Sequence, residues 1–288
     1  MTMKHYYLIT TEHLEDRLWF RDGEDFRVAM NYVAVAAFLS GVMVLAFILM
    51  SNHVHFVLAC SREDAERFVN TFKRLYASYF YRKYGVNELL RRNGVDIREV
   101  NDSDESLERA IAYVLMNSVA ANICFEPSGY PWGTGNVFFN DNPFPGRCLG
   151  EFSGRAQMRM LKSNVMLPGD YKIGSGGYIL PESYVQVKGV EALFRTPKRL
   201  GYFLRTSSKA RQRLEGGAAP SFRDQNILSA SEDLCHSLFR ANRISDLGVE
   251  QKTELLRQLG RRFSADLNQI CRVTGIPYEE AARMLDGW

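Results

Sequence analysis

Two histidines on one predicted strand are the residues of this 288-residue chain best suited to bind a metal ion. His53 and His55 are separated by one residue, and alternate side chains of a strand point to the same face. Two imidazoles on one face can ligate the same ion, although a histidine pair can equally be satisfied within a core. The pair alone indicates a metal site without establishing one.

A tyrosine and an asparagine on a later predicted helix could complete such a site. Tyr113 and Asn117 are four residues apart, a spacing that places both side chains on one helix face. If this helix covers the sheet face that carries His53 and His55, Tyr113 can serve as a nucleophile and Asn117 as a third metal ligand. The alternative is that Tyr113 is a core aromatic beside Ile111.

The elements that must hold these residues follow the order of a ferredoxin-like α+β fold. Apolar periodicity and turn signals predict strands over residues 6–10, 42–50, 53–60 and 96–100, and helices over residues 25–39, 61–85 and 102–119. The first six elements have the order strand, helix, strand, strand, helix, strand of an antiparallel ferredoxin-like sheet. The remaining helix, which carries Tyr113, must then cover the sheet face that the first two helices leave open.

One uncharged run, Val33 to Met50, has the length of a membrane span. Ser40-Gly41 interrupts this run, which predicts a helix end followed by a buried strand. The N-terminus lacks a secretory signal, and the five cysteines form no Cys-x-x-Cys pair. We therefore expect no membrane association, no disulfide scaffold and a cytoplasmic location.

The residues around the histidine pair resemble a known family. Met50-Ser51-Asn52-His53-Val54-His55-Phe56-Val57-Leu58 is similar to the HUH motif of single-tyrosine transposases, in particular the REP-associated tyrosine transposases. Tyr113-Val114-Leu115-Met116-Asn117-Ser118 is similar to that family's Tyr-Ile-x-x-Asn-Pro pattern, and Tyr130-Pro131-Trp132 to its Tyr-Pro-Trp element. The resemblance covers roughly residues 1–140.

The sequence departs from the family pattern in three places. Ser118 replaces the usual proline, and Gly133-Thr134 replaces the usual serine pair. Leu89-Leu90-Arg91-Arg92 stands where a segment containing Trp-Gln is expected. These departures leave the DNA specificity and the activity open.

The resemblance implies a transesterase that acts on single-stranded DNA without ATP. The Tyr113 hydroxyl would attack a phosphodiester, leaving a 5′-phosphotyrosine and a free 3′-hydroxyl. A divalent ion would be held by His53, His55 and Asn117, and this ligand set suits Mg²⁺ or Mn²⁺, with Mn²⁺ more tolerant of nitrogen ligands. Hairpin DNA is the expected partner, and the sequence leaves monomer and homodimer open.

Cations placed among aromatic residues indicate where single-stranded DNA could bind. The helix over residues 72–84 has this composition, although its aromatic residues could equally be core and its tyrosines are rival nucleophiles. Its candidate DNA-binding residues are Lys73, Arg74, Arg82 and Lys83.

Two further segments could contact DNA. A basic stretch over residues 198–213 begins with Lys198 and Arg199, and it is either a DNA-binding surface or an exposed amphipathic helix. Near the C-terminus, residues 270–285 resemble a helix-turn-helix with its turn at Gly275, which would place Arg283 near a DNA groove. A protein-contact role is the alternative for this helix pair.

Proline and glycine residues divide the chain into three predicted parts. We expect an HUH-type transposase or nuclease domain over residues 1–142, a basic extension over 143–220 and a helical region over 221–288. Pro143, Pro145 and Gly146 mark the first boundary, and Gly216-Gly217 reads as a linker near the second.

Two other functions compete with the transesterase. A metal-dependent hydrolase of the barrel type begins its metal site with His-x-His, but it needs further histidines, and only His236 follows His55. A non-catalytic, domesticated protein that binds DNA hairpins would keep the same fold and would not depend on Tyr113.

Overall fold

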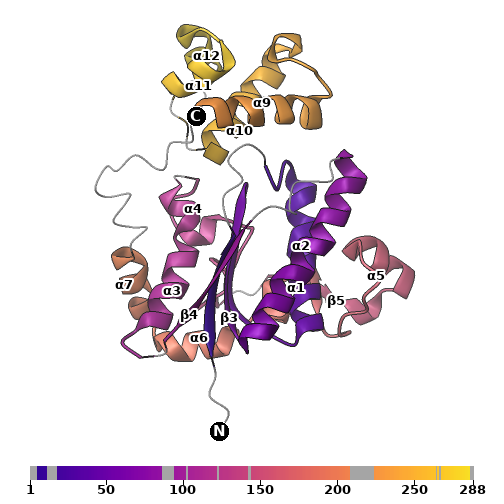
Figure 1. Ribbon diagram of the computed structural model, residues 1–288, viewed down its shortest axis with the longest axis vertical. Coiled ribbons are helices and arrows are strands. Elements are labelled where there is room, and N and C mark those ends of the chain that lie inside the picture. Colours follow the sequence, from indigo (N-terminus) through magenta and orange to yellow (C-terminus); the bar gives the residue numbers. More distant parts are fainter. Residues whose placement is uncertain are drawn as a thin grey trace.

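The computed structural model describes residues 5–11, 18–85, 94–101, 103–121, 123–141, 144–207, 224–263, 265 and 267–285. These residues form a central antiparallel sheet with helices on both faces, followed by a helical C-terminal region (Figure 1). None of the helices in these ranges is long and apolar enough to cross a membrane.

The central sheet has four strands, β1 (Tyr6–Thr11), β2 (Met43–Met50), β3 (His53–Ala59) and β4 (Val95–Val100). Their order is β2-β3-β1-β4, and every neighbouring pair is antiparallel. The two-residue turn Ser51-Asn52 joins β2 to β3. The predicted ferredoxin-like α+β fold is confirmed, because the strands alternate with helices in the βαββαβ order.

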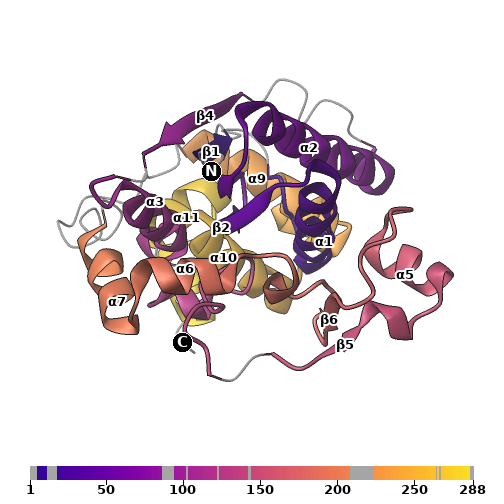
Figure 2. The same cartoon turned by 90° about the horizontal axis from the view of Figure 1, so that it is seen from below.

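Helices α1 (Gly23–Ser40) and α2 (Arg62–Tyr84) pack on one face of this sheet (Figures 1 and 2). The Phe56 ring of β3 meets Phe68 and Phe72 of α2, with ring centroids 4.9 and 5.5 Å apart. Helix α1 ends at Gly41, whose φ of 67° lies in the left-handed region that glycine adopts without strain. The uncharged run is therefore a helix end followed by a buried strand, as the sequence predicts.

Helices α3 (Ser106–Leu115) and α4 (Asn117–Ala120) lie on the opposite sheet face, which confirms the predicted position of the Tyr113 helix (Figure 1). The prediction of one continuous helix over 102–119 is wrong in one detail, since Met116 interrupts it with φ −81° and ψ −1°. The Asn117 side chain donates hydrogen bonds to the carbonyls of Tyr113 and Val114. Such side-chain to backbone bonds compete with helical continuation.

The segment after the sheet domain packs against it. Its regular elements are β5 (Gly146–Cys148), α5 (Gly154–Leu161), β6 (Lys172–Gly174), α6 (Val187–Phe194) and α7 (Pro197–Thr206), with short 3-10 turns Pro127–Gly129, Leu149–Glu151 and Pro181–Ser183. Buried residues such as Ile179, Phe194 and Phe203 belong to the same core as the sheet. Part of the described segment 144–207 thus shares the core of the sheet, and the division of the chain into three parts stays a prediction.

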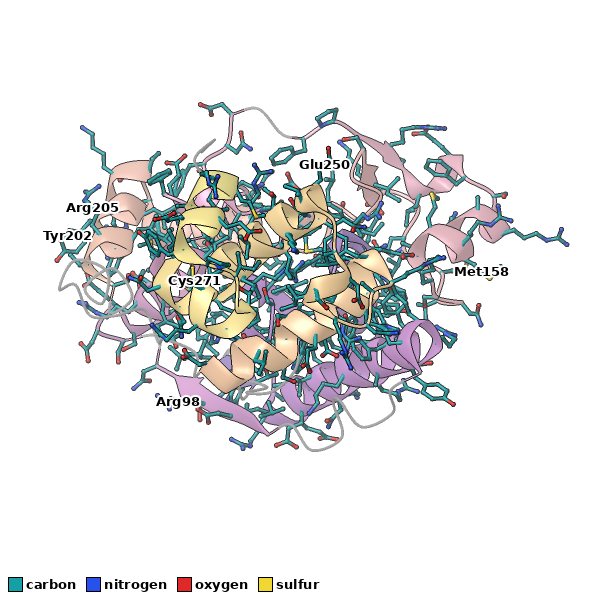
Figure 3. The ribbon with its side chains drawn as sticks, turned by 90° about the horizontal axis from the view of Figure 1, so that it is seen from above. Arg98, Met158, Tyr202, Arg205, Glu250 and Cys271 are labelled. Atoms are coloured by element: carbon teal, nitrogen blue, oxygen red, sulfur yellow. The ribbon has the colours of Figure 1, made fainter. Side chains whose placement is uncertain are left out.

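The C-terminal region is helical, as predicted. It comprises α9 (Asp224–Phe239), the 3-10 turn Ile244–Asp246, α10 (Val249–Phe263), α11 (Leu267–Thr274) and α12 (Tyr278–Leu285). These helices surround a core of their own and lie across one end of the sheet, away from the N-terminus (Figures 1 and 3). Lys209, Arg211, Arg213 and the Gly216-Gly217 linker lie outside the described residues.

Candidate active site

The two histidines of β3 lie side by side in the interior. His53 and His55 are 6% and 1% exposed, and their ring centroids are 4.9 Å apart with the rings nearly perpendicular. Strand alternation points both away from Phe56, and hence toward the face covered by α3 and α4. The predicted pairing of the two imidazoles on one face is therefore present in the fold.

Each imidazole is oriented by a hydrogen bond at Nδ1. His53 Nδ1 lies 2.8 Å from Asn52 Oδ1, and because an amide oxygen only accepts, His53 Nδ1 donates. His55 Nδ1 lies 3.0 Å from the Thr10 hydroxyl on the neighbouring strand. A histidine whose Nδ1 is held in this way binds a metal through Nε2, which is the usual arrangement in metal sites.

Tyr113 joins the histidine pair from α3. The Tyr113 ring meets the His55 ring edge-on, with centroids 5.5 Å apart and an interplanar angle of 85°. The tyrosine is half-buried, and α3 packs on β2 and β3. The fold thus brings the predicted nucleophile and the predicted metal ligands together, although they come from elements far apart in the sequence.

The charge of an arginine on the edge strand acts on Tyr113. Burial raises the pKa of the Tyr113 phenol above its ordinary value, and the positive charge of Arg98 partly offsets this rise. Arg98 lies on the edge strand β4, opposite Leu8, which in turn lies opposite Val57 of β3. Since Val57 and His55 share a sheet face, Arg98 belongs to the face of the site.

Arg98 is not among the site residues predicted from the sequence, although the alternation of side chains along β4 indicates its position. Asp96 and Arg98 alternate along β4, and Asp96 is aligned with Thr10, which is aligned with His55. The Arg98 guanidinium is 73% exposed and 3.1 Å from the Asp96 carboxylate. In Figure 3 this arginine lies at the outer edge of the molecule, where an incoming anion can reach it.

Asn117, the predicted third ligand, begins α4 beside Tyr113. Its side chain is buried, and Nδ2 donates to the Tyr113 carbonyl at 2.8 Å and to the Val114 carbonyl at 3.3 Å. These bonds fix the orientation of the amide and leave Oδ1 as the atom that could bind a metal ion. The Asn117 amide is thus tied directly to the backbone of the predicted nucleophile.

The residues at this site fit a divalent transition metal better than Mg²⁺. Within the described ranges, no group of three His, Cys, Asp or Glu residues could hold a metal ion. An ion here would depend on His53, His55 and a neutral oxygen such as Asn117 Oδ1. Mn²⁺ accepts such mixed nitrogen and oxygen ligands, whereas Mg²⁺ prefers oxygen alone.

The Tyr130-Pro131-Trp132 element closes the outer edge of β2 next to the site. Tyr130 Oη donates to the Leu49 carbonyl at 2.7 Å, and Leu49 N donates to the Trp132 carbonyl at 2.8 Å. At Gly133 a Cβ atom would lie 2.7 Å from the Phe47 carbonyl oxygen, so a side chain does not fit there.

Thr134, which follows Gly133, also hydrogen-bonds to the edge strand β2. Thr134 Oγ1 accepts from Phe47 N at 3.1 Å, and Thr134 N donates to the Phe47 carbonyl at 3.0 Å. Gly133-Thr134 therefore holds the edge strand on which the histidine hairpin is built.

The cations of α2 lie on the wrong side of the sheet for the predicted role. Helix α2 packs on the face opposite the histidines, so Lys73, Arg74, Arg82 and Lys83 do not join the site. Lys83 Nζ is instead 2.7 Å from an Asp22 oxygen and 2.8 Å from an Asp25 oxygen. The structure therefore gives these four residues no place beside the histidines, and their contact with DNA elsewhere on the surface stays a prediction.

The tyrosines of α2 are also engaged elsewhere. Tyr79 Oη and Tyr84 Oη each donate to an Asp25 carboxylate oxygen at 2.9 Å, and Tyr76 Oη donates to the Trp19 carbonyl. Burial raises the pKa of all three phenols. These residues are structural, which leaves Tyr113 as the tyrosine that meets the histidine pair.

The remaining predicted DNA-binding residues have different surroundings. Arg199 on α7 is 3.0 Å from Glu105 and 3.3 Å from Glu108, so it ties α7 to the start of α3. Arg199 therefore has a structural role in joining these two helices, and its contact with DNA stays a prediction. Lys198 and Arg283 are exposed, and their contact with DNA stays a prediction.

Comparisons with known proteins give one distant likeness. No family model matches the chain, and no curated protein matches its sequence. The structure of a REP-associated tyrosine transposase bound to a REP hairpin is similar at 10% sequence identity and a TM-score of 0.37, over 60% of this chain and 95% of that one. At this distance, function has to be inferred from the residues of the site itself.

Proposed function

We propose that this protein is a transposase-type DNA transesterase that cuts and rejoins single-stranded DNA through a 5′-phosphotyrosine. The observation that carries the proposal is the edge-on contact between the Tyr113 ring and the ring of His55, which itself packs against His53. The open antiparallel sheet also argues against the barrel-type hydrolase, because that class requires a closed barrel of strands.

The reaction exchanges one phosphate ester for another. Tyr113 Oη forms a bond to phosphorus, and the bond from phosphorus to the 3′ oxygen breaks. The phenolic proton leaves to solvent or base, and the departing 3′ oxygen takes up a proton as the DNA end becomes a free hydroxyl. The reverse attack by a 3′-hydroxyl rejoins a strand, so no ATP is consumed.

Tyr113 needs help to act at neutral pH. A phenol near pKa 10 is a weak nucleophile, and burial raises the pKa of Tyr113 further. Arg98 acts in the opposite direction, and its guanidinium suits a phosphate oxygen as well as a developing phenolate. A divalent ion held by His53, His55 and Asn117 would supply Lewis-acid polarisation of the scissile phosphate.

The remaining features of the proposal come from the motif resemblance. The proposed substrate is single-stranded DNA that contains hairpins, and the proposed metal is Mn²⁺ or Mg²⁺. The proposed location is a reducing cytoplasm. None of the five cysteines, all of which lie in the described ranges, forms a disulfide, which is compatible with that compartment.

The test is covalent capture of DNA. Protein is incubated with labelled single-stranded hairpin DNA from its own gene's flanks and Mn²⁺ or Mg²⁺, then separated on a denaturing gel. We expect an adduct that Tyr113→Phe abolishes and His55→Ala reduces by at least about 100-fold. Tyr81→Phe is the matched control, since Tyr81 is 51% exposed on the opposite side of the sheet.

Two other outcomes would redirect the proposal. DNA binding without an adduct under either metal would favour the non-catalytic hairpin-binding protein. An adduct of undiminished yield in Tyr113→Phe would show that another side chain is the nucleophile.

A further inference from the structure

A short segment before α1 connects the C-terminal helices with the sheet. Residues 18–22, called the strap below, are all described, and Leu18, Trp19 and Phe20 are fully buried. Leu18 belongs to the core of the C-terminal helices, whereas Trp19 and Phe20 belong to the core of the sheet. The strap therefore packs into both cores within three residues.

The strap holds the turn that precedes the histidine strand. Trp19 N and Phe20 N donate to the Ser51 carbonyl at 2.8 and 3.1 Å. Ser51-Asn52 is the turn between β2 and β3, and Asn52 Oδ1 accepts the hydrogen bond of His53 Nδ1. A shift of the strap would consequently move the group that orients the His53 ring.

An arginine of the C-terminal helices binds the backbone of the strap. Arg262 of α10 donates from Nη1 to the Phe20 carbonyl and from Nη2 to the Arg21 carbonyl, both at 2.6 Å. Its Nε donates to Gln258 Oε1 at 2.7 Å, which fixes the guanidinium within its own helix. The planar guanidinium thus donates to two successive backbone carbonyls of the strap.

Further contacts prevent the strap from moving independently. The Arg21 guanidinium is 3.2 Å from the Asp233 carboxylate of α9, and Arg21 N donates to the buried Asp25 carboxylate at 2.8 Å. The strap is consequently fixed to α9 and α10 on one side and to α1 on the other.

We propose that Arg262 is a positioning residue of the site, through which the C-terminal helices set the orientation of His53. Arg262 fixes the strap, the strap fixes the Ser51-Asn52 turn, and Asn52 holds the His53 ring with its proton on Nδ1. The C-terminal helices are then part of the site's framework as well as a candidate DNA-binding unit. The catalytic part of this inference rests on the proposed function, whereas the state of the His53 ring does not.

The first test measures the His53 ring directly, without metal or DNA. Nitrogen-15 NMR of the histidine side chains reports which ring nitrogen carries the proton. We expect the Nδ1–H form for His53 in the unmodified chain and a mixture of both forms in Arg262→Lys, because one ammonium cannot reproduce the two-carbonyl fork. Arg243→Lys is the control, an exposed arginine of the same helical region.

The second test follows adduct formation with single-stranded hairpin DNA and Mn²⁺. For Arg262→Lys we expect about a tenfold lower rate at saturating DNA and a DNA concentration dependence within about twofold of the unmodified chain. If the unmodified chain forms no adduct, the proposed function fails, but the NMR result still decides the role of Arg262.

Two results would overturn the inference. One is an unchanged His53 spectrum in a folded Arg262→Lys protein, which would make Arg262 a purely structural contact. If Arg262→Lys does not fold, Asp233→Asn loosens the same strap at a partly exposed ion pair, and it should shift the His53 spectrum in the same direction by a smaller amount. An unchanged spectrum in Asp233→Asn would then overturn the inference.

Discussion

Replacement of Asn117 separates its structural role from its proposed role as a ligand. In Asn117→Ala the chain loses the hydrogen bond to the Tyr113 carbonyl at 2.8 Å and the longer one to the Val114 carbonyl at 3.3 Å. A buried hydrogen bond contributes about 1 kcal/mol net, and its loss leaves the carbonyls poorly satisfied. We expect a loss of about 2 kcal/mol, or roughly 5 °C in Tm.

Asn117→Asp keeps the shape and changes the chemistry. Without metal, the carboxylate places oxygen against the carbonyls of Tyr113 and Val114, so Asn117→Asp should be less stable than Asn117→Ala. With metal, the same carboxylate would join His53 and His55 in a set of two imidazoles and one carboxylate. Mn²⁺ at 100 times its Kd stabilises a folded protein by about 2.7 kcal/mol.

The assay is thermal unfolding of the unmodified chain and both variants with and without Mn²⁺. The gain in Tm from Mn²⁺ should be largest for Asn117→Asp, intermediate for the unmodified chain and smallest for Asn117→Ala. Equal gains in all three proteins would refute the assignment of Asn117 as a ligand, even if both variants are destabilised.

Three further perturbations test the framework of the site. Arg98→Gln should raise the pKa of Tyr113, because a cation lowers the pKa of a nearby phenol. Carbon-13 NMR titration of the tyrosine side chains measures this pKa, and an unchanged value in the variant would contradict the effect of Arg98. Gly133→Ala should cost about 2–3 kcal/mol in urea unfolding, since its Cβ meets the Phe47 carbonyl oxygen, and a neutral effect would refute that contact. The ion pair of Asp22 and Lys83 should make the free energy of unfolding fall below about pH 4 and above about pH 10, because folding lowers the pKa of Asp22 and raises that of Lys83. Lys83→Met should weaken the pH dependence at both ends. An unchanged pH dependence in this variant would contradict a stabilising role of the ion pair.

Much of the fold was predictable because the sequence signals are local. The nine apolar residues Val42 to Met50 and the Gly41 break predict a helix end and a buried strand, and the structure has both. Strand alternation places His53 and His55 on one face, and the element order places the Tyr113 helix over that face. These inferences need only periodicity and the order of elements.

Periodicity does not describe contacts between residues distant in sequence. The sequence pattern predicts DNA-binding cations on α2, yet a helix on the α1 side of the sheet cannot meet histidines on the α3 side. The pairing of Lys83 with Asp22 and of Arg199 with Glu105 joins residues distant in sequence, and no spacing rule predicts it. The Arg262 contact with the strap is equally invisible in the sequence, because no spacing rule relates one of two adjacent arginines near a helix end to residues 20 and 21.

The central claim is that Tyr113 becomes bonded to DNA, and mass spectrometry of the adduct tests it most directly. After incubation with Mn²⁺ and single-stranded hairpin DNA, the adduct is digested with nuclease and protease, and the modified peptide is fragmented. We predict a nucleotide 5′-phosphate on Tyr113. A nucleotide on another tyrosine, or its complete absence while DNA still binds, would contradict the claim.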